Sequence, residues 1–248
     1  MSFSKIAPIY DRFNDLTVYE NWLDFTLDYL DGPGMKVLDV GCGTGYFTQM
    51  LAPFSETITG VDLDAQMLKQ AQAAYSIPNL EFKQANMLDL SSLSNDYQLV
   101  TCFADTLCFL KNIEEVELAL KQIYQRMTSD SILLFDVWTP YQIKEGFHDF
   151  NYFDLDDLAV LTWQSRSYPD QLMAEHYLTA LSKIEESGLY ERVDTQLVER
   201  TYPMEKYQKA LRKAGFNDIE VTVDFGNDLF NAKVHQTVDR WFFAAYKQ

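Results

Sequence analysis

Hydrophobic and polar positions follow two different rhythms along this chain. Over residues 16–30, apolar side chains recur every three or four positions, which predicts a helix that stops at residues 31–33. Short apolar runs then alternate with further helical periods, and Asn112 and Glu115 fit the cap of one of these helices. The expected strands span 36–40, 57–62, 80–84, 97–103 and 131–137, and the expected helices span 45–52, 65–75 and 113–127. This alternation is typical of a parallel sheet with helices on both faces.

The helical period disappears between Thr139 and about Thr201. The stretches AVLTWQSRSY, LMAEHYLTALSKI and YERVDTQLVERTY either alternate or are rich in β-branched and aromatic residues. Such segments are typical of strands. We therefore expect a small antiparallel insert here.

The α/β pattern resumes after the insert. Pro203 suits the first position of a helix that ends near Gly215. Two strands, 219–225 and 239–246, follow with no helix between them, so they are expected to pair as a hairpin. The expected fold class is α/β, a doubly wound, seven-stranded, mostly parallel sheet with a small antiparallel β insert.

The charge of the chain narrows its partners. There are 37 Asp and Glu against 20 Lys and Arg, a net charge of −17, and the acids are spread along the sequence. A surface of that sign repels a phosphate backbone, and no local basic patch is visible, so no nucleic-acid partner is expected. A small molecule or a protein is the expected partner.

The cysteines indicate a reducing compartment, and the apolar runs are too short to predict a membrane helix. Three cysteines, at 42, 102 and 108, form neither a disulfide framework nor a zinc site, so we expect packing roles and no metal. No apolar run approaches the ~20 residues of a membrane helix. The N-terminal MSFSKIAPIYDRF has no basic region followed by an apolar stretch. The predicted location is cytoplasmic, without a membrane association.

A glycine-rich turn follows the first strand directly. Residues 35–45 read MKVLDVGCGTG, and the next strand ends in Asp62. We expect a ligand to lie against bare backbone here, because a β-carbon at Gly41 or Gly43 would occupy the space that it needs. A carboxylate about 20 residues further on, at the tip of the neighbouring strand, is placed to accept both ribose hydroxyls. The pattern predicts an adenosine cofactor.

The spacing of this turn separates one adenosine cofactor from another. A dinucleotide fingerprint reads GxGxxG and places a pyrophosphate on the helix N-terminus. Here the turn reads DxGxGxG, so the third glycine comes one residue early. Asp39, Val40, Gly41, Cys42, Gly43, Thr44 and Gly45 resemble the first motif of the class I S-adenosylmethionine-dependent methyltransferases. The resemblance implies S-adenosylmethionine as cofactor and S-adenosylhomocysteine as product, which suits an acid at Asp39 and a loop without Lys or Arg.

The resemblance implies further cofactor contacts at the strand ends. Asp62 matches the ribose-binding acid of the family, with Leu63 beside it, and Met67 lies one turn into the following helix, where it can pack on the adenine. The family commonly has an acid at the position of Asn86, so this chain departs from the pattern. The asparagine oxygen can accept the same bond, and the backbone amide of Met87 can donate to the ring.

The same resemblance implies a cleft between the cofactor and the acceptor, and a lid over the cofactor. Phe103 is expected to offer its backbone to the methionine tail, and Asp105 to face the methyl acceptor. IAPIYDRF and YENWLDF resemble the lid of small-molecule methyltransferases of the glycine and sarcosine type. In those enzymes an early tyrosine and tryptophan cover the cofactor, which implies Tyr10 and Trp22 here. Aromatic faces suit a sulfonium, because a cation beside one gains roughly 0.5 to 2 kcal/mol.

The expected reaction is an in-line transfer of a methyl group to a small-molecule acceptor. A general base helps when the acceptor arrives protonated, and we predict Asp105 and His176 as catalytic residues, with His148 and tyrosines of the insert as alternatives. The implied methyltransferase domain comprises residues 1–138, including a helical lid over 1–34, and 203–248. The insert, 139–202, is expected to cover the acceptor site and to set specificity.

Other functions remain open at this point. A protein methyltransferase and a non-catalytic binding protein with a cofactor fold are the two main alternatives. An NAD-dependent oxidoreductase is disfavoured by the early third glycine and by the lack of a YxxxK proton relay. No pattern in the sequence identifies the acceptor or the oligomeric state.

Overall fold

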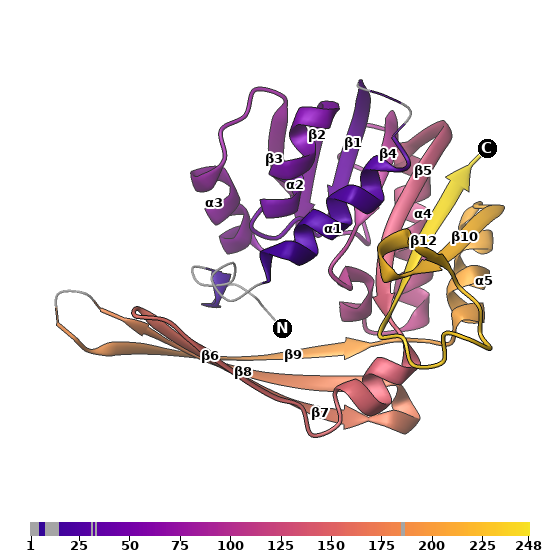
Figure 1. Cartoon of the computed structure of the whole chain (residues 1–248). Helices are drawn as coiled ribbons and strands as arrows, with labels where there is room; N and C mark the ends of the chain where they lie inside the picture. The colour runs from indigo at the N-terminus through magenta and orange to yellow at the C-terminus, as the bar shows by residue number, and fades with distance from the viewer. Residues whose placement is uncertain (1–4, 8–14, 31, 33, 185–186) are drawn as a thin grey trace.

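The chain folds into two sheets of different size. The computed structural model describes residues 5–7, 15–30, 32, 34–184 and 187–248. Figure 1 shows a large sheet flanked by helices and a long, small sheet that crosses one end of it. Within the described residues, no helix combines the length and the hydropathy that crossing a bilayer requires.

The large sheet contains eight strands in the order β11-β10-β12-β5-β4-β1-β2-β3. Their bounds are β1 (Met35–Val40), β2 (Ser55–Asp62), β3 (Leu80–Gln84), β4 (Tyr97–Cys102), β5 (Met127–Trp138), β10 (Asp218–Val223), β11 (Asp228–Leu229) and β12 (Arg240–Lys247). The first five pair in parallel, and β12 runs antiparallel between β5 and β10. The expected α/β fold class is confirmed. The strand beyond the seven expected ones is β11, which contributes only two residues against β10.

Five α-helices accompany the large sheet in the described residues. They are α1 (Leu16–Leu27), α2 (Tyr46–Leu51), α3 (Ala65–Ala74), α4 (Ile113–Arg126) and α5 (Met204–Ala214). Because successive side chains of a strand point to opposite faces, Val37 packs with α1 and α2 while Leu38 packs with α4 and α5. Helices thus cover both faces, as the alternating pattern predicts.

Local signals account for the helix ends. The Asn112 side chain accepts a hydrogen bond from the Glu115 N–H at 2.9 Å, which confirms the expected cap of α4. The apolar period predicts a helix that reaches residue 30, but α1 ends at Leu27. The N–H groups of Tyr29 and Leu30 instead donate to the carbonyls three residues earlier, as in isolated turns. Frayed ends of this kind are set by local hydrogen bonds that the apolar period does not report.

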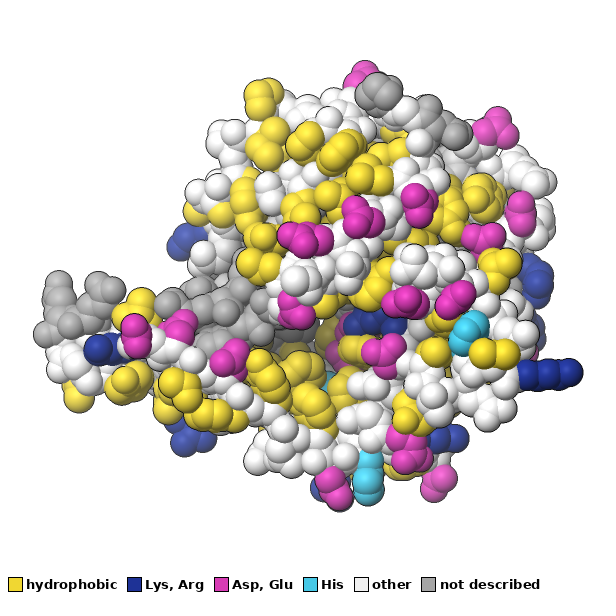
Figure 2. Space-filling view, in the orientation of Figure 1, with side chains coloured by type: hydrophobic (Ala, Val, Ile, Leu, Met, Phe, Trp, Pro, Cys, Tyr) yellow, Lys and Arg dark blue, Asp and Glu magenta, His cyan; other side chains and the backbone are white. Residues whose placement is uncertain are grey.

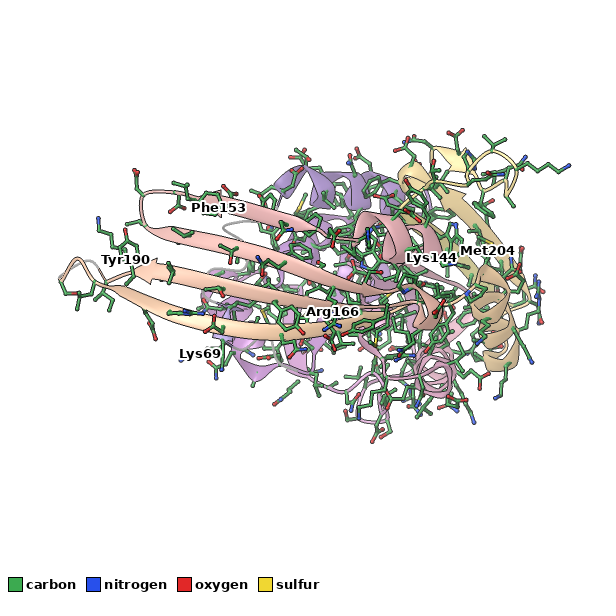
Figure 3. All side chains as sticks on the ribbon, turned by 90° about the horizontal axis from the view of Figure 1, so that it is seen from below. Lys69, Lys144, Phe153, Arg166, Tyr190 and Met204 are labelled. Carbon is green, nitrogen blue, oxygen red and sulfur yellow. The ribbon has the colours of Figure 1, made fainter. Side chains whose placement is uncertain are left out.

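The small sheet contains the strands β6 (Asn151–Leu155), β7 (Ala159–Tyr168), β8 (Met173–Lys183) and β9 (Tyr190–Arg200). All its neighbours pair antiparallel, in the order β6-β7-β8-β9. The chain enters it after β5 and leaves it before α5, so it begins at the edge where the parallel strands end. Figure 3, viewed from below Figure 1, shows these four strands passing in front of the large sheet. Three of the strands were expected; β6 is an additional one whose side chains are mostly exposed, so it has no apolar alternation.

Candidate active site

Two cavities adjoin at the edge where the parallel strands end. The loop cavity, of about 430 Å³, is lined by the glycine-rich turn, the end of β2, the start of α3 and the segment after β3. The insert cavity, of about 450 Å³, is lined by α1, the ends of β4 and β5, the start of β12 and all four strands of the small sheet. Ala104, Phe109 and Leu197 line both. The two cavities therefore share a wall.

The glycine-rich turn is held against β2 by backbone hydrogen bonds. The N–H groups of Gly41 and Cys42 both donate to the carbonyl of Val61, at 2.7 and 3.0 Å. Gly41 has φ +78°, and a β-carbon there would lie 2.4 Å from Thr106 Cγ2. Glycine at position 41 is therefore required by the side chain of Thr106 and not, as expected, by ligand space. Gly41 itself lines the loop cavity, and its contact with the cofactor stays a prediction.

At Gly43, by contrast, the space that a β-carbon would occupy is open, as expected for a ligand site. Its φ is +54°, and a β-carbon there would have no atom of the described chain within 4 Å. Gly43 lines the loop cavity, and its N–H donates to Asp62 Oδ2 at 2.9 Å. The turn thus presents bare backbone to open space at this position.

Asp62 lies at the tip of β2 and lines the loop cavity. Its Oδ1 accepts a hydrogen bond from the Asp64 N–H at 2.7 Å, and its Oδ2 accepts the bond from Gly43. Burial raises the pKa of this carboxyl group, while the N–H bonds from Asp64 and Gly43 act in the opposite direction. Each oxygen keeps a further lone pair, so this carboxylate can also accept hydroxyl groups from a ligand.

Asp39 lies behind the glycine-rich turn rather than in a cavity wall. Its two oxygens accept hydrogen bonds from the hydroxyls of Thr48, at 2.6 Å, and Thr101, at 2.8 Å. Burial raises the pKa of Asp39 to about 6. Cys42 and Gly45 also lie outside both cavity walls: the Cys42 side chain is buried, and Gly45 is the N-cap of α2. The expected contact of these three residues with the cofactor stays a prediction.

The segments after β2 and β3 contribute the opposite wall of the loop cavity. Leu63 is largely exposed and Met67 is buried, and both line the cavity together with Asn86 and Met87. Asn86 Oδ1 accepts a hydrogen bond from the Leu88 N–H at 3.0 Å. The asparagine oxygen therefore has one lone pair left for a ligand.

Trp22, on α1, and Phe103, which follows β4, contact each other. Their rings stack at a centroid distance of 5.9 Å, and Trp22 Nε1 donates to Asp136 Oδ2 at 3.1 Å. Trp22 lines the insert cavity, whereas Phe103 belongs to the core and its carbonyl accepts the Thr106 hydroxyl at 2.7 Å. Tyr10, the other expected lid residue, lies outside the described residues.

Asp105 belongs to a buried ionic cluster. The Asp105 N–H donates to Asp136 Oδ1 at 2.9 Å, and Arg240 Nη2 donates to Asp105 Oδ1 at 3.0 Å. Arg240 also pairs with Asp136, and its guanidinium lies 3.8 Å from the centroid of the Trp138 ring. Burial is the main cause that raises the pKa of Asp105 to about 8 and of Asp136 to about 6, and the negative charge of Glu199 adds to the shift of Asp105. At the centre of Figure 2, basic and acidic side chains lie together in the hollow between the body and the small sheet.

His176, on β8, is buried and uncharged at neutral pH. Trp163 Nε1 lies 3.1 Å from His176 Nδ1, and because an indole N–H only donates, Nδ1 is the unprotonated nitrogen. His176 Nε2 therefore carries the proton and donates to Glu199 Oε2 at 3.2 Å. Burial lowers the pKa of His176 to about 4. The lone pair that a general base would use is already engaged, and Glu199 is the group that His176 positions.

Three charged residues of this site were not anticipated. Asp136 lies near the carboxyl end of β5. Ligand-binding residues gather at the carboxyl ends of parallel strands, so the sequence contained a signal for it. Arg240 is the first residue of β12. Because β12 runs antiparallel to β5, its start lies at the edge where the parallel strands end. Glu199 had no signal, because its place depends on how the small sheet sits over the large one. His148, by contrast, is exposed and lies 3.5 Å from Asp149.

No metal site accompanies these groups in the part of the chain that the structure describes, where no three His, Cys, Asp or Glu residues gather as ligands. The cavities, the open space at Gly43 and the carboxylate of Asp62 suit a nucleoside instead. The site can hold an adenosine ligand beside a second molecule.

Comparisons with known proteins agree with this geometry. The family described as "Methyltransferase domain" matches residues 37–130. A relative from Geobacillus sp. (strain WCH70), named a putative methyltransferase, is 34% identical over the whole of both chains. The "Putative methyltransferase YqeM" of Bacillus subtilis (strain 168) is 30% identical and covers all of this chain and 98% of its own.

Solved structures share the fold at lower identity. An S-adenosylmethionine-dependent methyltransferase from Clostridium acetobutylicum ATCC 824 superposes with a TM-score of 0.84 at 20% identity, over 99% of this chain and 98% of its own. CalS10 from Micromonospora echinaspora, an amino pentose methyltransferase solved with S-adenosylmethionine bound, gives 0.70 at 19% identity, over 97% of this chain and 95% of its own. The chain thus belongs to the class I S-adenosylmethionine-dependent methyltransferases and uses S-adenosylmethionine as its cofactor.

Proposed function

We propose that the enzyme methylates a small molecule bound in the insert cavity. The observation that carries the proposal is the wall shared by the two cavities at Ala104, Phe109 and Leu197. Methyl transfer requires the acceptor atom about 3 to 3.5 Å from the methyl carbon, with water excluded. A volume of about 450 Å³ lies within the range of small-ligand pockets.

In this proposal the loop cavity holds the nucleoside. S-adenosylmethionine supplies a methyl group activated by its positively charged sulfur. Asp62 accepts the ribose hydroxyls, Gly43 leaves room for the ligand against the backbone, and Met67, Asn86 and Met87 surround the adenine. The support is that these residues line one cavity, with the polar atoms of Asp62 and Asn86 only partly engaged by the protein.

Two glycine substitutions separate ligand space from protein packing. Gly43→Ala is expected to weaken S-adenosylhomocysteine binding about tenfold, since the new methyl group enters the cavity, and to cost about 1 kcal/mol of stability through its positive φ. Gly41→Ala is expected to lower the free energy of unfolding by about 2 to 3 kcal/mol, because the methyl group meets Thr106. Calorimetric titration and urea unfolding measure the two effects. Wild-type affinity in Gly43→Ala would contradict the placement of the nucleoside.

The insert cavity is mostly apolar and takes its outer wall from the small sheet. Trp163, Leu178 and Leu197 contribute from β7, β8 and β9. The division into a cofactor domain (1–138 and 203–248) and an acceptor-covering insert (139–202) follows from this arrangement and stays a prediction. Some relatives are named for small-molecule acceptors: a 2-phytyl-1,4-naphtoquinone methyltransferase of Nostoc sp. (strain PCC 7120 / SAG 25.82 / UTEX 2576) is 27% identical over 64% of this chain.

Other acceptor classes fit the surface less well. Figure 2 shows acidic side chains scattered over the whole visible face. With a net charge of −17, such a surface disfavours nucleic acid. A protein substrate would have to reach an acceptor atom that lies behind the small sheet.

The test uses methyl-labelled S-adenosylmethionine and fractionated cell extract. The label is expected in the low-mass fraction, and label found only in protein or RNA would overturn the proposal. Leu178→Trp serves as the matched variant, because Leu178 lines the insert cavity and not the loop cavity. It is expected to slow transfer by at least about tenfold through steric exclusion, with S-adenosylhomocysteine affinity within about twofold of wild type.

A further inference from the structure

We propose that the methyl acceptor is an amine, which binds as an ammonium ion at the carboxyl pair of Asp105 and Glu199 and is methylated on nitrogen. This inference names the substrate class of the insert cavity and rests on the proposed function. Four features of the described residues carry it: the excess of carboxylates, the neutrality of His176, the position of Arg240 and the aromatic walls.

Negative charge exceeds positive charge at the floor of the insert cavity. Asp105, Asp136 and Glu199 are all at least nine-tenths buried, and Arg240 is the single Lys or Arg among the described residues that line the cavity. Arg240 is already engaged by Asp136 and Asp105. The charge of Arg240 lowers the pKa of Glu199 through space, but the ion pairs of Arg240 are with Asp105 and Asp136. Glu199 therefore has no direct ion pair with Arg240, and a buried carboxylate without a bound cation is unfavourable.

His176 does not supply the missing positive charge. Its tautomer is fixed by the donor Trp163, and burial holds its pKa at about 4, so it meets Glu199 as a neutral donor. The hydrogen bond from His176 engages Oε2 of Glu199. Without a bound cation, the pair of carboxyl groups retains a proton. Burial and the negative charge of Glu199 raise the pKa of Asp105 to about 8, and burial raises the pKa of Glu199 to about 7. An ammonium ion supplies the charge that the protein lacks here.

The walls of the insert cavity favour a cation as well. Trp138 faces the Arg240 guanidinium, but Trp163 and Phe150 form a separate corner, with ring centroids 5.3 Å apart and planes at 68°. Both rings line the cavity. Aromatic faces attract cations and offer nothing comparable to an anion. A carboxylate or phosphate acceptor would face like charges from Asp105 and Glu199.

The reaction balances with groups already present. The ammonium ion gives one proton to the Glu199 carboxylate, which leaves a nitrogen lone pair. That lone pair forms a bond to the methyl carbon while the carbon–sulfur bond breaks, and the electron pair of the broken bond stays on sulfur. The products are an N-methylammonium ion, S-adenosylhomocysteine and protonated Glu199, which releases its proton to solvent. A base that titrates near neutrality suits this exchange.

Binding of matched probes tests the charge preference directly. The protein saturated with S-adenosylhomocysteine is titrated by calorimetry at pH 8 with benzylamine, cyclohexylmethylamine and butylamine, and with the corresponding alcohols and carboxylates. At least one amine is expected to bind at least about tenfold more tightly than its alcohol, with the carboxylate weakest. The absence of any amine preference in all three sets overturns the inference.

Two variants distinguish the carboxyl pair from the general acidity of the protein. Glu199→Gln keeps the shape and the acceptor for His176 but removes the charge, and it is expected to abolish most of the amine preference. Glu175→Gln is the matched control: it precedes His176 on β8, so it lies on the opposite face, where it accepts bonds from Tyr168 and Tyr177. Its amine preference is expected to remain that of wild type, and equal losses in both variants would contradict the role of Glu199.

The pH dependence gives a further readout. Groups facing Glu199 are His176 from β8, Asp105 after β4, the buried thiol of Cys108 and, beyond Asp105, Arg240 and Asp136. The pKa of Cys108 is raised well above its ordinary value, so this thiol stays neutral, and Asp136 completes its ionisation just above pH 6 beside Arg240. Because Asp105 and Glu199 gain most of their charge between pH 6 and 8.5, amine affinity is expected to rise over this range in wild type and to rise less in Glu199→Gln. A flat wild-type profile speaks against the inference.

Failure of this inference is separable from failure of the proposed function. In the labelling experiment, label attached to oxygen, sulfur or carbon of a small molecule, located by mass fragmentation, rejects the amine and leaves the proposed function standing. A low-mass fraction without label rejects both.

Discussion

Replacement of Asp62 by alanine is expected to weaken S-adenosylhomocysteine binding by about 100-fold. Hydrogen bonds to a charged group contribute roughly 1.5 to 3 kcal/mol each, and losing about 3 kcal/mol corresponds to two orders of magnitude in the dissociation constant. The substitution also frees the Gly43 N–H, which Asp62 now holds at 2.9 Å. Asp62→Asn keeps one oxygen acceptor, and an intermediate loss of about tenfold is expected. Calorimetric titration of the purified variants measures both.

A neighbouring aspartate controls for loosening of the segment. Asp64 caps α3 by accepting hydrogen bonds from the N–H groups of Gln66 and Met67. Asp64→Ala is expected to cost about 1 kcal/mol of stability as a lost cap and to change affinity less than about threefold. If Asp64→Ala reduced binding as much as Asp62→Ala, the anchoring role of Asp62 would be refuted.

Arg240→Met is expected to lower the free energy of unfolding by about 3 to 5 kcal/mol at pH 8, because it leaves two buried carboxylates without their cation. The loss is expected to shrink as the pH falls toward 5.5. Arg240 lowers the pKa of both Asp105 and Asp136, so removing it raises both further above their ordinary values. A folded-state pKa above the unfolded one means that the folded protein binds more protons, so stability is retained at low pH and lost as the pH rises through the folded-state pKa.

Urea unfolding of wild type and variant at pH 5.5, 7 and 8.5 measures this dependence. Arg192→Met is the control, because Arg192 pairs with Asp194 on the exposed surface of the small sheet, where an ion pair adds little. Its stability relative to wild type is expected to stay constant over the same range. A loss in Arg240→Met that did not depend on pH would show that packing, rather than buried charge, dominates.

Most of the fold could be predicted because its elements carry strong local signals. The strand at 80–84 and the insert strand at 159–168 coincide with β3 and β7. β6 and β11 could not be predicted, since both are short, largely exposed strands whose existence depends on a neighbouring strand. The helical period also overestimated the length of α1, because that period does not reveal where the hydrogen bonds of a helix stop.

The candidate site divides in a similar way. The turn at Gly43 and the acid at Asp62 lie in one continuous stretch with a known spacing, so the sequence alone points to them. Asp136, Glu199 and Arg240 come together only through the pairing of β12 with β5 and the placement of the small sheet. The reason why position 41 requires glycine could not be predicted either, because nothing in the sequence shows that Thr106 packs against it.

The position of β12 makes the large sheet incomplete without residues 240–247. This strand is the last of the large sheet along the chain, yet it lies in the interior, between β5 and β10. It also carries Arg240, the cation of the buried cluster. A chain that lacks residues 240–247 is therefore expected to leave β5 and β10 without the strand that pairs with both, and to leave Asp105 and Asp136 without their cation. Such a truncated chain is expected to be sensitive to protease and unable to transfer methyl groups.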